Sequence, residues 1–163
     1  MFDLKPLTRE SIPRALEKAE RYRLLNEPAE AESICQDVLN VDPGNQPALV
    51  TLLLACTELF DEELAENVKE AEAACARLKD DYSRAYYGGI VCERKAKTQM
   101  KRGTAGSGYA AYESVRKAMA FYEKAEAIRP AGNDDALLRW NTCVRLLERN
   151  PHVAPAPRAS AEL

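Results

Sequence analysis

A spacing pattern that occurs twice in the chain constrains its fold more than any other feature. Four residues follow one another at the same intervals in two distant stretches: Ala31, Cys35, Val38 and Pro43, and Ala118, Tyr122, Ala125 and Pro130. Such intervals place three apolar side chains on one helical face, and the proline ends the helix. The repeated spacing therefore predicts an internal repeat of helices and an all-α fold.

Composition and charge fit one helical domain. The 163 residues are few in glycine and carry a net charge of -3, whereas a duplex nucleic-acid binder usually has a basic surface. The N-terminus lacks the apolar core of a secretory signal, and the longest apolar run, 48–56, is too short to span a bilayer. We therefore expect a cytoplasmic protein without a membrane span, and nucleic acid is not the expected partner.

The five cysteines allow two interpretations, a metal or redox site and a set of small core residues. They are odd in number, contain no CxxC pair, and each falls on a helical face that should be buried. This pattern favours apolar packing in a reducing compartment. We therefore predict no metal site and no cofactor.

Helical periodicity continues along most of the chain. It predicts an irregular lead-in over residues 1–9, seven antiparallel helices over 10–149, and a disordered tail rich in proline and alanine over 150–163. Each helical hairpin alone would leave an apolar face exposed, and stacking the hairpins buries that face. The domain should therefore be a stack of hairpins.

The chain resembles the tetratricopeptide repeat family, whose unit is a helix-turn-helix of about 34 residues. Positions one such period apart carry similar residues, and equal steps after Pro43 and Pro130 reach residues at the packing positions of that family: Leu49, Leu53 and Cys56, and Ala136, Trp140 and Cys143. Gly89 stands where the family favours a small residue. The resemblance implies a solenoid of three hairpins plus a C-terminal capping helix.

The third hairpin, 82–129, departs from the family pattern. It holds about seventeen more residues than the first hairpin, with the glycine-rich segment 103–108 near their midpoint. We predict two arms that are each longer by about two turns, so that the tip projects on the order of 12 Å. The second hairpin departs less, with Asn67 in place of a small residue and Lys79 in place of the closing proline.

In this family the first helix of each hairpin lines a concave groove, which implies a set of partner-binding residues. They are Leu16, Glu20, Arg23, Val50, Leu54, Thr57, Tyr86, Ile90, Arg94, Leu137, Asn141 and Arg145. A largely apolar groove of this kind suits a peptide or an amphipathic helix of another protein. The predicted function is a non-catalytic scaffold or adaptor. An alternative is a homo-oligomeric scaffold whose groove or long hairpin self-associates.

A local basic cluster provides a second alternative. It consists of Arg94, Lys95, Lys97, Lys101 and Arg102 in an otherwise acidic protein. The cluster could bind RNA or another anionic surface. The competing interpretation is a solvated helix end, where positive charge interacts favourably with the helix dipole.

Catalysis has little support in the sequence. His152 is the only histidine and falls in the predicted tail, so a histidine-activated nucleophile is not expected. The carboxylates are expected on outward faces, and Tyr122 and Trp140 are expected to pack in the core. We predict no enzymatic activity and no catalytic residue.

Overall fold

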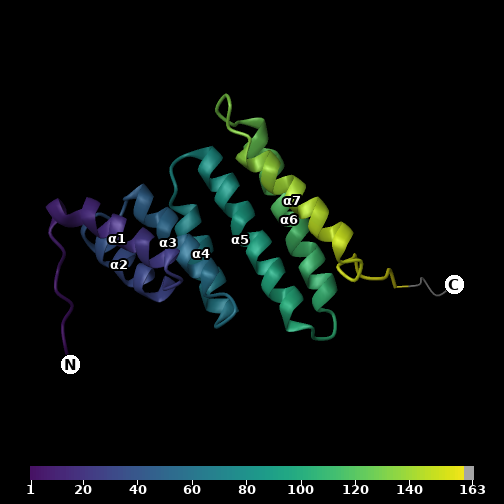
Figure 1. Cartoon of the computed structure of the whole chain (residues 1–163), viewed down its shortest axis with the longest axis horizontal. Helices are drawn as coiled ribbons and strands as arrows, with labels where there is room; N and C mark the ends of the chain where they lie inside the picture. The colour runs from purple at the N-terminus through teal and green to yellow at the C-terminus, as the bar shows by residue number, and fades with distance from the viewer. Residues whose placement is uncertain (160–163) are drawn as a thin grey trace.

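The computed structural model describes residues 1–159, and those residues form helices without any strand (Figure 1). A short 3₁₀ turn, η1 (Arg9–Ser11), precedes seven α-helices: α1 (Ile12–Leu24), α2 (Pro28–Val41), α3 (Gln46–Glu58), α4 (Leu64–Ala76), α5 (Asp81–Arg102), α6 (Ser107–Ala127) and α7 (Asp135–Arg149). The prediction of an all-α fold is confirmed. Positions 160–163 of the predicted tail lie outside the described residues.

Local sequence signals set several helix ends. Prolines occupy the first turns of α1, α2 and α3, where a missing N–H costs nothing. The Asn45 side chain accepts a hydrogen bond from the Ala48 amide at 2.9 Å and caps α3, and Asp80 caps α5 through the Ser83 amide at 3.0 Å. Gly103 ends α5 with a positive φ of 60°.

The helices pack in chain order, each against the next, which is consistent with a helical repeat (Figure 1). In addition α1 contacts α3, and α3 contacts α5. The apolar interior has two parts. One belongs mainly to α1–α4 and the other to α5–α7, and the half-buried side chains of Leu54 and Tyr87 touch both parts.

The pair α5 and α6 is longer than any other pair of successive helices in the described chain. These helices span 22 and 21 residues, whereas α1 to α4 span 13 or 14 each. Gly103 and Gly106, both at positive φ, form the turn between them. The extra length carries the tip of this hairpin past α7 to the segment that follows α7.

That following segment packs against the hairpin tip, which differs from the disorder predicted for the whole tail. Val153 is only 4% exposed within the apolar interior of α5–α7, and its amide donates to the Asn150 carbonyl at 2.9 Å. The His152 carbonyl lies so close to Gly108 that any Cβ there would overlap it. Valine is apolar enough to anchor the segment, although the surrounding prolines and alanines resemble a linker.

The cysteines occupy interior positions, as their helical spacing predicted. Cys35, Cys56, Cys75 and Cys143 are buried, Cys92 is half-buried, and all five thiols are free. Within residues 1–159, no group of three histidine, cysteine or carboxylate side chains could hold a metal ion. Over the same residues no helix combines the length and the apolar character needed to cross a membrane.

Candidate interaction surface

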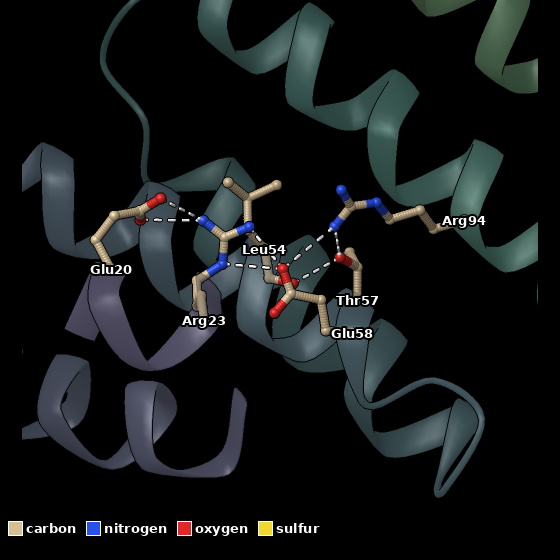
Figure 2. A network of polar contacts seen from close by, with 6 residues as sticks. All are labelled: Glu20, Arg23, Leu54, Thr57, Glu58 and Arg94. Carbon is tan, nitrogen blue, oxygen red and sulfur yellow. Dashed lines mark hydrogen bonds and ion pairs between the residues drawn. The ribbon is translucent and has the colours of Figure 1, made fainter. Parts of the chain in front are cut away.

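Three stripes of predicted groove residues run along α1, α3 and α5. Their members recur at helical spacing, and the last members of the stripes lie close together. Arg94 from α5 bonds Thr57 from α3, and Arg94 and Arg23 from α1 both approach Glu58 (Figure 2). Glu20 and Glu58 complete this polar network. We call the side of α1, α3 and α5 that carries the stripes the odd-helix face.

Arg23 connects α1 to α3. Its Nε and Nη2 both donate to Glu58 Oε1, at 3.0 and 2.6 Å, and its Nη1 donates to both carboxylate oxygens of Glu20, at 3.1 and 3.0 Å (Figure 2). Burial alone would lower the pKa of Arg23, but the two carboxylates raise it above its ordinary value. Arg23 is therefore a structural cation, and each of its three guanidinium nitrogens already donates a hydrogen bond.

Arg94 connects α5 to α3 but uses few of its hydrogen-bond donors. Its Nη1 donates to Thr57 Oγ1 at 2.5 Å and lies 3.9 Å from Glu58 Oε1. Within residues 1–159 its Nε and Nη2 have no hydrogen-bond or ion-pair partner, and the side chain is 30% exposed. Burial lowers the pKa of Arg94, and Arg139 and Arg23 lower it further against the attraction of Glu58.

Glu93, the residue before Arg94, is fully buried between α5, α6 and α7. Its carboxylate accepts from the Tyr122 hydroxyl at 2.7 Å and pairs with Lys97 at 3.0 Å and Arg139 at 3.1 Å. The expectation that the carboxylates face outward is wrong at this position, and Tyr122 does more than pack. One signal was present in the sequence, because Glu93 lies one turn from Gly89 on the face of α5 that meets Tyr122.

Arg139 brings α7 to this site. Its Nη2 reaches Glu93, whereas its Nε is buried and has no hydrogen-bond partner in the described chain. The predicted groove residues of α7 were Leu137, Asn141 and Arg145. Within residues 1–159, none of these three forms an ion pair or side-chain hydrogen bond with the network, and Arg145 is exposed. The spacing did not indicate Arg139, because its role depends on how α7 is rotated against α5.

The apolar part of the odd-helix face is smaller than predicted. Ile90 and Thr57 are buried and offer almost no surface. The half-buried residues that can be touched from outside are Leu16, Val50, Leu54 and Tyr86. Tyr86 is held by aromatic neighbours, stacking on Tyr82 at 5.9 Å between ring centroids. The face thus combines a rigid apolar strip with an arginine-bearing end.

The predicted basic cluster is partly neutralised within the chain. Lys97 pairs with Glu93, and Lys101 pairs with Asp61 at 2.7 Å. Hydrogen bonds from Lys101 and Thr98 lower the pKa of Asp61. Lys95 and Arg102 have no ion-pair partner within residues 1–159. The Lys97 pair lies within α5, whereas the Lys101 pair connects α5 to the segment between α3 and α4.

No family model, no curated protein and no solved structure matches this chain. The functional inference therefore depends on the residues of the odd-helix face themselves. Their side chains come from α1, α3 and α5, and Arg139 of α7 lies nearby.

Proposed function

We propose that the chain is a non-catalytic interaction scaffold of the tetratricopeptide-repeat type, which binds a segment of another protein across the odd-helix face. The supporting observation is that α1, α3 and α5 present Leu16, Val50, Leu54 and Tyr86 half-exposed, next to a polar network that crosses all three helices. Its setting would be the cytoplasm, where five free thiols stay reduced.

The rigidity of the face favours this role. Arg23 and Arg94 tie α1 and α5 to α3, so the apolar strip has a fixed shape before a partner arrives. A preorganised surface loses less conformational entropy on binding than a mobile one. A partner peptide or amphipathic helix could place its apolar side chains along the strip.

Affinity capture with matched variants tests the proposal. The baits are wild type, a face variant combining Leu54→Glu with Tyr86→Ala, and a control variant, Ile128→Ala, which removes an exposed apolar side chain at the end of α6. Captured proteins are identified, purified and titrated calorimetrically against each bait. We expect one partner to bind wild type and the control but not the face variant. Equal binding to all three baits would contradict the proposal.

Light scattering on the same three baits distinguishes self-association. A dimeric wild type that becomes monomeric in the face variant would identify a second copy as the occupant of the face. A wild-type monomer leaves the face free for a different protein. Thermal unfolding must show that the face variant is still folded before its binding is interpreted.

A further inference from the structure

Arg94 has donors that the folded chain does not use. One of its three guanidinium nitrogens bonds Thr57, and the nearest carboxylate, Glu58, is already bonded by Arg23 (Figure 2). The remaining two nitrogens are not buried within residues 1–159, so they can be reached from solvent. A guanidinium presents its N–H groups as a planar fork that fits a carboxylate.

The charges around Arg94 leave a positive excess. Two separate groups of ion pairs lie around residues 93 and 94. Arg23 and Arg94 pair with Glu20 and Glu58, and this group is balanced, whereas Lys97 and Arg139 share the single carboxylate of Glu93. Arg139 is near enough to Arg94 to repel it and lower its pKa. One additional carboxylate near Arg94 and Arg139 would balance the two groups taken together and reduce that repulsion.

We propose that Arg94 receives a carboxylate from an acidic segment of the partner protein, with Arg139 adding to the attraction. An apolar side chain beside that carboxylate would lie on Leu54 and Tyr86, which are half-buried on the same face. This inference rests on the proposed scaffold function and specifies the chemistry of its partner.

The same geometry disfavours a nucleic acid. A phosphodiester chain gains affinity by neutralising many phosphates with many cations. Here Lys97 and Lys101 are already paired with Glu93 and Asp61. The carboxylates of Glu20 and Glu58 would repel a second phosphate beside the first. A single carboxylate next to an apolar group suits the site better.

A random linear peptide library displayed on phage tests the inference with the full-length protein. The library is selected in parallel on wild type, on Arg94→Gln, on Leu54→Glu, and on Arg102→Gln. The last variant removes one charge from an exposed position of the same helix. We expect wild type and Arg102→Gln to enrich peptides that share an acidic residue beside an apolar one.

Synthetic versions of an enriched peptide then measure the contact. Replacing its acidic residue with the matching amide should weaken binding to wild type by roughly tenfold or more, the loss of a charge-assisted pair. Arg94→Gln should weaken the acidic peptide equally and the amide peptide hardly at all, because both changes remove one contact. Arg94→Lys, which keeps the charge, should recover part of the affinity.

The outcomes separate the two proposals. One outcome would overturn the proposed carboxylate contact but keep the scaffold function. In that outcome the enriched peptides lack an acidic residue, bind Arg94→Gln as well as wild type, and do not bind Leu54→Glu. If no peptide is enriched, or if the enriched peptides bind Leu54→Glu as well as wild type, both the carboxylate contact and the scaffold function are overturned. Tighter, Arg94-dependent binding of a twelve-nucleotide oligouridylate would assign the site to nucleic acid. Matching thermal unfolding of all variants ensures that each result reports on binding.

Discussion

The buried carboxylate of Glu93 should be among the most sensitive polar positions for stability. It is fully buried and has three partners, the Tyr122 hydroxyl at 2.7 Å, Lys97 at 3.0 Å and Arg139 at 3.1 Å. The Glu93→Ala substitution deletes the acceptor for all three. Lys97 can turn to water because it is partly exposed, but the Tyr122 hydroxyl is left buried without a partner.

The expected loss follows from these contacts. Removing one partner from a buried ion pair costs about 3–5 kcal/mol, because the remaining charge is left uncompensated. An orphaned buried hydroxyl costs about 1–3 kcal/mol, but the two costs share one acceptor and do not simply add. Since a domain is stable by about 5–15 kcal/mol, Glu93→Ala should remove a large part of the total. Glu93→Gln, which keeps the volume and one acceptor, should cost about 1–3 kcal/mol.

Urea unfolding followed by circular dichroism at neutral pH measures these losses. Glu113→Ala is the matched control, because it removes an exposed glutamate of α6 that has no ion-pair partner in the described chain. We expect the control to change the unfolding free energy by less than about 0.5 kcal/mol. A loss below about 1 kcal/mol for Glu93→Ala would refute the reasoning, since the pair would then contribute no more than a surface contact.

Three further measurements test the fold. Gly89→Ala should lower the free energy of unfolding in urea by about 1–3 kcal/mol, because a Cβ would overlap the Tyr122 ring. Gly88→Ala should leave that free energy nearly unchanged, because its Cβ would lie 3.1 Å from the half-buried ring of Phe121. Val153→Asp should lower the melting temperature, because Val153 is 4% exposed in the interior of α5–α7, and an unchanged melting temperature would show that the segment is dispensable. Burial raises the pKa of all five thiols, that of Cys75 to about 11, so the folded state binds these protons more tightly than the unfolded state does. Stability should therefore fall as pH rises above the unfolded thiol value of about 8.5, and urea midpoints that stay constant between pH 8 and 10 would contradict this.

The all-α fold could be predicted because its signals are local. The matched spacing of Ala31 to Pro43 and Ala118 to Pro130 is recognised from helical periodicity and proline alone. The apolar residues that this spacing places on one helical face are all buried: Ala31, Cys35, Val38, Ala118, Tyr122 and Ala125. The stripes on α1, α3 and α5 could also be predicted from residue spacing within each helix. The structure adds that Arg94 bonds Thr57 and that Arg23 and Arg94 both approach Glu58 at one end of the stripes.

The features that were missed depend on the packing between helices. Arg139 reaches Glu93 because of how α7 lies against α5, and nothing in the sequence of α7 alone specifies that rotation. Val153 stands among residues typical of a linker, and only the length of α5 and α6 brings the hairpin tip to it. The burial of Glu93 could have been suspected from its spacing to Gly89, but its partners could not.

Glu93 and Arg94 are consecutive residues of α5, and this adjacency links the two halves of the molecule. Consecutive side chains on a helix point about 100° apart, so one can face inward while the other faces a neighbouring helix. Glu93 binds α5 to α6 and α7, and Arg94 binds α5 to α3. A carboxylate bound at Arg94 would therefore lie beside the contact that joins the two apolar interiors. Ligand binding at this position should raise the urea midpoint of the whole chain, and Arg94→Gln should abolish that gain while leaving the free protein folded.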